Sequence, residues 1–337
     1  MILDQAIRKV GQGQDLEVEE TRAVFDVIFK GEASEEDLAA LLTALRNKGE
    51  SVSELQGAVL SMRAAMKTIE VPHGAVDIVG TGGDGHGTLN VSTAAALVAA
   101  GGGAVVAKHG NRAATSLSGS SDVLAALGIN LRPEWPVLET CLREAGIVFL
   151  FAPNHHPSMK HVAAVRKKLG VRTIFNLLGP MTNPGNVKYH VLGVYDYAWA
   201  KPMAQTLAAL GSEAAWVTYG HSGLDEISIT GESLVMELKG GALTELTVSP
   251  EQVGLSPAPL DSIKGGDAAA NAQAILRLLE GRKNAYRDIV LMNAGAALYV
   301  AGQAKDYVSA VALAADSIDT GKAQAKLAEL IRITNET

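Results

Sequence analysis

Apolar residues recur three and four positions apart through the first 70 residues, over 2–10, 24–28 and 38–45, and no strand pattern interrupts them. This spacing predicts helices. Ser34 with Asp37 and Ser51 with Glu54 have the spacing of capping boxes, which places helix starts near the two serines. Pro72 ends the pattern. We therefore expect a small helical unit over residues 1–70.

After residue 70, short apolar runs bounded by glycine alternate with helical patterns, which predicts a mostly parallel sheet covered by helices. The expected strands are 76–79, 104–107, 147–151, 189–194 and 214–218. Two apolar runs, 234–238 and 243–248, flank Gly240-Gly241 and predict a hairpin, as a peripheral addition. After Asp267 the chain is expected to be helical, with breaks at Gly281 and Gly302.

The alternation of strand and helix fails once, where 156–169 and 171–178 both have helical patterns. We expect these two helices to pack back on the N-terminal unit. The predicted fold class is therefore a small all-helical domain, 1–70 completed by about 156–184, beside a larger α/β domain, 71–155 with 185–337.

Composition narrows the class of protein. With 337 residues the chain has the length of about two domains, and 47% hydrophobic residues can fill a sizeable core. A net charge of −7 argues against a general nucleic-acid surface, although a local basic site stays open. The single cysteine, Cys141, cannot form an intrachain disulfide, and the charged N-terminus is unlike a signal peptide. With no apolar window of membrane-spanning length, we expect a cytoplasmic protein.

The segment 75–122 carries the most unusual chemistry. An apolar strand runs into a loop with glycines at 80, 82, 83, 85 and 87, after which Asn90, Ser92 and Thr93 open an alanine-rich helix. Residues without Cβ let backbone N–H groups approach an anion, and a helix N-terminus adds partial positive charge. The loop therefore predicts an anion site.

Other interpretations of this loop fit less well. Gly80, Gly82 and Gly85 satisfy GxGxxG, but a dinucleotide site expects an acidic residue after the next strand, where this chain has Lys108. A Walker loop fails because Thr88 follows Gly87 where that motif needs lysine. A tight turn without a ligand is the remaining alternative, and turns seldom carry so many glycines before a helix start.

A second polar cluster follows the next strand, with Lys108, His109, Asn111 and Arg112 ahead of a run rich in serine and threonine over 115–121. Ligands of parallel sheets bind at the carboxyl ends of strands. Lys108 suits phosphate as a point charge. Two anion sites on neighbouring strands predict a substrate with two separated phosphate groups, although such a run is often only a solvated loop.

Several ordered motifs together resemble the anthranilate phosphoribosyltransferase family. They are GTGGDGHGTLNVST at 80–93, KHGNRAATS at 108–116, GSSDVLAALG at 119–128, VRTIFNLLGPMTNP at 171–184 and GLDEIS at 223–228. The resemblance implies the two-domain fold, a homodimer formed through the helical domain, and a substrate site between the domains. It also implies transfer of the 5-phosphoribosyl group of 5-phosphoribosyl 1-diphosphate to the amine of anthranilate, with release of pyrophosphate, in tryptophan biosynthesis.

The resemblance also implies a set of site residues. Mg²⁺ would bind Ser92, Asp225 and Glu226, a pair of carboxylates that local sequence alone would assign to the surface. Anthranilate would contact Gly80, His109, Asn111 and Arg166, with His109 as the candidate catalytic residue and Arg166 as the carboxylate clamp. The phosphoribosyl diphosphate would contact Gly80, Gly83, Asp84, Thr88, Asn90, Val91, Ser92, Thr93, Lys108, Ser116 and Ser120.

Two other classes remain as alternatives. A nucleoside phosphorylase of the same fold would share a glycine loop, but the KHGNR, NLLGP and GLDEIS segments favour the transferase. A nucleic-acid-binding relative without activity is disfavoured by the net negative charge and by the retained Ser92, Asp225 and Glu226. The HHPSMKH segment at 155–161 lacks a strong zinc spacing and is expected to make helix-entry contacts.

Overall fold

The computed structural model describes residues 2–112 and 117–336. Its N-terminal part is helical as predicted, and the Ser34 and Ser51 hydroxyls accept hydrogen bonds from the backbone of Asp37 and Glu54 at two helix starts. Leucines along one face of the third helix are fully buried. The four helices are α1 (Ile2–Gly11), α2 (Val18–Lys30), α3 (Glu35–Lys48) and α4 (Val52–Ala65).

Within the described residues, seven strands form one sheet in the order β3-β2-β1-β4-β5-β6-β7. The first five pair parallel with one another, as the alternation predicted. They are β1 (Val76–Gly80), β2 (Val106–Gly110), β3 (Ile147–Phe151), β4 (Tyr189–Gly193) and β5 (Ala214–Tyr219). β2 begins two residues later than predicted because Ala104 N still donates to Ala99 O, 3.1 Å away, in the turn that ends the preceding helix.

The strand order reverses beside β1. β2 and β3 lie on one side of it, whereas β4 and β5 lie on the other, with Gly80 opposite Gly193 in the register. Open parallel sheets bind ligands outside the carboxyl ends of their strands at such a switch point. The glycine loop starts there.

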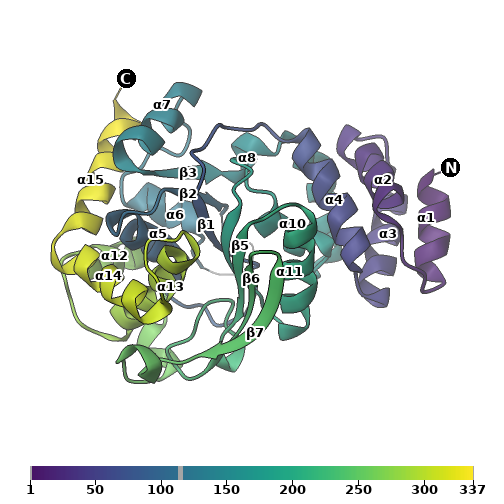
Figure 1. The fold of residues 1–337 in the computed structure, drawn as a ribbon. Coiled ribbons are helices and arrows are strands. Elements are labelled where there is room, and N and C mark those ends of the chain that lie inside the picture. The colour runs from purple at the N-terminus through teal and green to yellow at the C-terminus, as the bar shows by residue number, and fades with distance from the viewer. Residues whose placement is uncertain (1, 113–116, 337) are drawn as a thin grey trace.

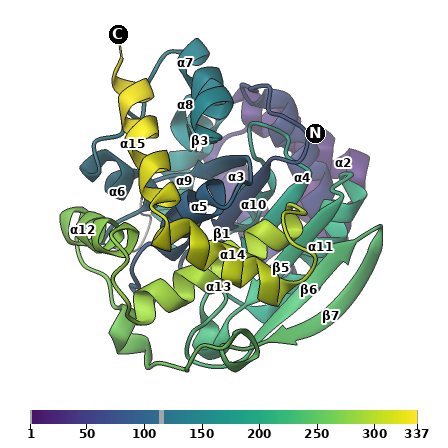
Figure 2. The same cartoon turned by 60° about the vertical axis from the view of Figure 1, so that its left-hand side comes forward.

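The predicted hairpin is β6 (Ser233–Lys239) with β7 (Ala242–Val248). Its turn residues Gly240 and Gly241 both have positive φ, 57° and 80°, which fits a type I′ turn. The hairpin is peripheral as predicted, at one edge of the sheet, and β6 pairs antiparallel with β5, so that the hairpin continues the central sheet. Figure 2 shows β7 along the outer edge.

Helices cover both faces of the sheet (Figure 1). Burial alternates along the strands, so that Val191 packs into one core cluster and Leu192 into the other. Helix α5 (Val91–Gly101) and α13 (Ala285–Val300) contact one face, and α11 (Ala200–Ala209) contacts the other. The remaining helices of this part are α6 (Ser120–Ala126), α7 (Trp135–Thr140), α12 (Ala268–Leu279), α14 (Tyr307–Asp319) and α15 (Lys322–Asn335).

The two consecutive helices pack on the N-terminal unit. In place of the predicted 156–169 helix, a short 3-10 turn (Pro157–Met159) leads into α9 (Lys160–Leu169), and α8 (Ala152–His155) precedes both. Gly170, at φ 63°, ends α9, and α10 (Ile174–Met181) starts at Thr173. α9 contacts α2 and α3, and α10 contacts α3 and α4. Figure 1 shows α1 to α4 at one end of the molecule, with α10 between α4 and the sheet and α15 at the opposite end.

No helix in the described ranges is long and apolar enough to cross a membrane.

Candidate active site

The glycine loop leaves β1 at Gly80 and enters α5 at Val91. Gly82, Gly83, Gly85 and Gly87 have φ of 70°, 76°, 81° and 61°, a left-handed backbone that favours glycine. Thr81 pins the start of the loop to β4, because its N–H donates to Gly193 O at 2.9 Å and its hydroxyl accepts from Tyr195 N at 3.1 Å. Hydrogen bonds therefore hold the start of the loop at Thr81, and the residues after it are largely glycines in left-handed backbone.

Two carboxylates from a distant segment lie against this loop. Asp225 Oδ2 accepts a hydrogen bond from Gly82 N at 2.6 Å, and Glu226 Oε1 accepts one from Ser92 N, in the first turn of α5, at 3.1 Å. A Cβ on Gly80 would lie 2.3 Å from Asp225 Oδ2, and one on Gly193 would lie 1.6 Å from Asp225 O. Glycine at the ends of β1 and β4 therefore leaves the space that Asp225 occupies.

The charges gathered here are close together and poorly hydrated. Burial raises the pKa of Asp225, and the neighbouring Asp84 raises it further. Burial also raises the pKa of Glu226, and the neighbouring Asp225 adds to that rise. Lys108 is buried in the same place, where its Nζ donates to Ile78 O at 2.6 Å and to Ser92 Oγ at 3.4 Å. Burial lowers the pKa of Lys108. Burial therefore disfavours the charged forms of Asp225, Glu226 and Lys108 at the mouth of the loop.

This donor set fits a hard divalent cation. Ser92, Asp225 and Glu226 offer hydroxyl and carboxylate oxygens, the ligand type that Mg²⁺ prefers. Among the residues that the structure describes, no group of three or more His, Cys, Asp or Glu side chains could hold a metal ion. Mg²⁺ usually keeps water and substrate phosphate oxygens among its ligands, so two carboxylates and a hydroxyl are a sufficient protein contribution.

The far end of the loop is held by C-terminal residues that sequence reasoning missed. Asn90 Oδ1 accepts from Asn271 Nδ2 at 2.8 Å, and Asn90 O accepts from the Tyr286 hydroxyl at 3.1 Å. Gly265 N donates to Gly87 O at 2.8 Å, and Thr88 forms an isolated bridge with Lys264. Polar residues inside the apolar patterns of α12 and α13 were the available signal.

A buried carboxylate fixes the end of β2. Asp77 Oδ1 accepts from His109 N at 3.0 Å, and its Oδ2 accepts from Asn183 Nδ2 at 2.7 Å. Burial raises the pKa of Asp77 to about 6. The Nε2 atoms of His109 and His156 lie 3.2 Å apart, so one ring donates and the other accepts. Burial lowers the pKa of both rings, which keeps them neutral at pH 7. Sequence reasoning missed Asp77 and Asn183, and it gave His156 only a general contact role.

The other predicted residues are spread around the loop. Val91 and Thr93 are buried within α5. Ser120 Oγ donates to Asn111 O at 3.1 Å, which joins the start of α6 to the end of β2, and Asn111 itself is exposed. Ser116 lies outside the described residues. The Arg166 guanidinium lies over the Phe175 ring, 5.4 Å from its centroid, and no hydrogen bond among the described residues links it to His109 or Asn111.

Two family models match the chain and define its class as a glycosyl transferase. They are "Glycosyl transferase family, helical bundle domain" over residues 4–66 and "Glycosyl transferase family, a/b domain" over residues 73–324. The mostly parallel sheet with its small helical unit is the architecture of this group.

Individual relatives narrow the class. The chain is 53% identical to the anthranilate phosphoribosyltransferase of Rhodopseudomonas palustris strain BisA53, over 98% of this chain and 97% of the relative. It is 51% identical to that of Bradyrhizobium sp. strain BTAi1, over 99% of each.

Among solved structures, the anthranilate phosphoribosyltransferase of Thermus thermophilus superposes with a TM-score of 0.93 at 43% identity, covering 98% of this chain and 99% of that one. The Saccharomyces cerevisiae enzyme in complex with PRPP and Mg has a TM-score of 0.90 at 29% identity, covering 98% and 97%.

The chain belongs to the anthranilate phosphoribosyltransferase family. Its reaction transfers the 5-phosphoribosyl group of 5-phosphoribosyl 1-diphosphate (PRPP) to the amine of anthranilate in tryptophan biosynthesis and releases pyrophosphate.

Proposed function

We propose that the glycine loop and the first turn of α5 bind PRPP, with the loop holding its diphosphate. The observation that carries this assignment is the convergence of Asp225 and Glu226 on the backbone N–H groups of Gly82 and Ser92. This convergence supports the proposal because it brings two carboxylates against the glycine loop and the first turn of α5. The proposed contacts are Gly80, Gly83, Asp84, Thr88, Asn90, Val91, Ser92, Thr93, Lys108, Ser116 and Ser120.

We propose that Mg²⁺ binds Ser92, Asp225 and Glu226. The yeast relative is described in complex with PRPP and Mg, and the oxygen donors here suit the same ion. When bound, Mg²⁺ would neutralise charge on the departing pyrophosphate. The glycine loop would add backbone N–H donors directed at the same leaving group. Lys108, on β2, reaches the same place, with its Nζ 3.4 Å from Ser92 Oγ.

We propose that anthranilate binds at Gly80, His109, Asn111 and Arg166. Another structure of the yeast relative is described in complex with 4-fluoroanthranilate. The aromatic amine is neutral and nucleophilic near pH 7, so holding it in line with the anomeric carbon would supply most of the rate. The neutral ring of His109, the proposed catalytic residue, can accept or relay the proton that the amine loses.

We propose that the helical domain comprises residues 1–70 with about 156–184, and that 71–155 with 185–337 form the α/β domain. The packing of α9 and α10 against α2, α3 and α4 supports this division. We also propose a cytoplasmic homodimer formed through the helical domain.

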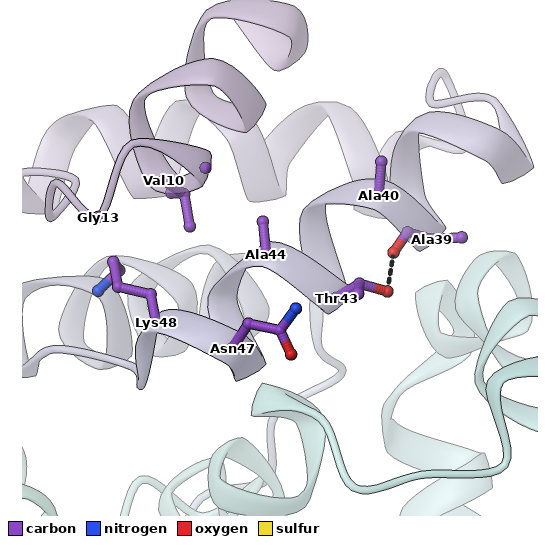
Figure 3. Close-up of a pocket in the computed structure, with 9 residues that line it drawn as sticks. Val10, Gly13, Ala39, Ala40, Thr43, Ala44, Asn47 and Lys48 are labelled. Carbon is purple, nitrogen blue, oxygen red and sulfur yellow. Dashed lines mark hydrogen bonds between the residues drawn. The ribbon is translucent and has the colours of Figure 1, made fainter.

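A hollow of about 640 Å³ lies between α1 and α3 in the helical unit (Figure 3). It is lined largely by small residues and contains none of the proposed substrate contacts. These residues are Val10, Gly11, Gly13, Ala39, Ala40, Thr43, Ala44, Asn47 and Lys48.

Calorimetric titration of PRPP with and without Mg²⁺ tests the proposed site. Ser92→Ala should weaken Mg²⁺-dependent PRPP binding about tenfold, because it removes one proposed cation ligand. Ser256→Ala, at an exposed position outside the proposed contacts, is the matched control and should bind like the unmodified protein. Unchanged binding in Ser92→Ala would contradict the assignment.

A further inference from the structure

Arg172 lies in the turn between α9 and α10 and reaches across to the glycine loop. Its Nη2 donates a hydrogen bond to the carbonyl of Gly83. The guanidinium lies over the ring of Tyr195, just beyond β4, with Cζ 3.9 Å from the ring centroid. Its Nε would lie 3.3 Å from a Cβ at Gly83. An exposed cation of the helical segment is thus held between two parts of the α/β region.

This contact fixes the direction of a peptide group in the loop. In a trans peptide the C=O and the following N–H point in opposite directions. With the Gly83 carbonyl bound by Arg172, the N–H of Asp84 points away from the arginine. The preceding Gly82 N–H is already committed to Asp225 Oδ2. Two peptide groups of the loop, 81–82 and 83–84, are therefore oriented by Asp225 and by Arg172 respectively.

The loop needs such orientation because it is built from glycines. Glycine loses more conformational freedom on ordering than any other residue, and Gly82 and Gly83 both occupy left-handed backbone. A loop ordered before the substrate arrives avoids that entropy loss during binding. Tyr195 contributes twice, since its ring lies under the guanidinium and its N–H donates to Thr81 Oγ1 at the start of the loop.

We propose that Arg172 is a positioning residue for PRPP: it orders the diphosphate-binding loop and ties that loop to the helical unit. This inference rests on the proposed PRPP site. Loss of the guanidinium disorders the loop, weakens PRPP binding and leaves the anthranilate contacts in place. The planar, multiply donating group is required, because a lysine ammonium can supply charge but not the same combination of stacking and directed hydrogen bonding.

Steady-state kinetics with each substrate varied separately test this inference. Arg172→Ala should raise KM for PRPP about tenfold, with kcat and KM for anthranilate within about twofold of the unmodified enzyme. Arg172→Lys should recover less than half of the loss. Tyr195→Leu should raise KM for PRPP in the same way, and the double variant should add little to Arg172→Ala, because both act through one contact.

Lys167→Ala is the matched control, since it removes an exposed cation five positions away on α9. It should leave KM for PRPP unchanged; an equal rise would mean general electrostatics and overturn the inference. A parallel loss in all kinetic constants with a lowered melting temperature would mean a merely structural role and would also overturn it.

Ser92→Ala separates failure of the inference from failure of the site. If Ser92→Ala raises KM for PRPP and Arg172→Ala does not, the role of Arg172 is wrong and the proposed site stands. If neither variant changes it, the proposed site is wrong as well.

Discussion

Replacing Asp225 by asparagine removes a charge from the proposed metal site while keeping the size of the side chain. In the structure, Asp225 Oδ2 accepts from Gly82 N at 2.6 Å and lies beside Glu226 and Asp84. An amide oxygen can still accept that hydrogen bond, so the loop keeps its anchor. What is lost is the interaction of a full negative charge with Mg²⁺.

The size of the effect follows from the strength of a charged contact. An interaction with a charged group is worth about 1.5–3 kcal/mol, which corresponds to a roughly ten- to hundredfold rise in the Mg²⁺ concentration that gives half-maximal rate. The metal-free protein should melt at the same temperature or higher, because burial and Asp84 already disfavour the charged form of Asp225. The two effects therefore have opposite signs.

The assay is the initial rate of anthranilate fluorescence loss at saturating PRPP, with Mg²⁺ titrated. Glu232→Gln, an exposed carboxylate six positions from Glu226, is the matched control and should titrate like the unmodified enzyme. An unchanged Mg²⁺ titration in Asp225→Asn would refute the metal assignment. A large fall in the melting temperature of the metal-free variant would refute the view that the buried Asp225 carboxylate destabilises the metal-free protein.

Three further changes probe other parts of the molecule. Arg166→Ala should lower kcat/KM for anthranilate, by an amount that corresponds to about 1.5–3 kcal/mol of lost transition-state stabilisation, and should leave KM for PRPP unchanged. Unaltered anthranilate kinetics would show that Arg166 does not belong to the site. Gly193→Ala should destabilise the protein by about 3 kcal/mol in urea unfolding, because the new Cβ would lie 1.6 Å from Asp225 O. Gly179→Ala, which meets nothing within 4 Å, is its control, and equal unfolding midpoints would contradict the packing argument. Asp77 has a folded pKa of about 6, above its unfolded value, so the unfolding free energy should fall by up to ~3 kcal/mol as pH rises from about 4 to 6. Asp77→Asn should abolish that component, and an identical pH slope in the variant would show that Asp77 does not titrate there.

Much of the fold followed from local patterns. The strand at Ile147–Phe151 matches its prediction at both ends, and the serine caps at Ser34 and Ser51 mark real helix starts. β2 begins later than predicted because the turn that ends α5 still holds Ala104 N by a hydrogen bond to Ala99 O, which apolar spacing does not show. The hairpin was recognised from its glycines, but its place in the central sheet depends on a long-range pairing with β5.

The site was harder to predict because it is assembled by contacts between distant segments. Asp225 and Glu226 look like a surface pair locally, and only the resemblance singled them out before the structure placed them beside Gly82 and Ser92. Asp77 interrupts an apolar strand pattern, yet it joins β2 to Asn183, 106 positions away.

The transferase reaction is tested by the stoichiometry of one reaction mixture that contains the protein, anthranilate, PRPP and Mg²⁺. Anthranilate fluorescence should fall only when all components are present, and one pyrophosphate should be released for each anthranilate consumed. Fluorescence loss without PRPP, or pyrophosphate release that does not require anthranilate, would contradict the transferase reaction.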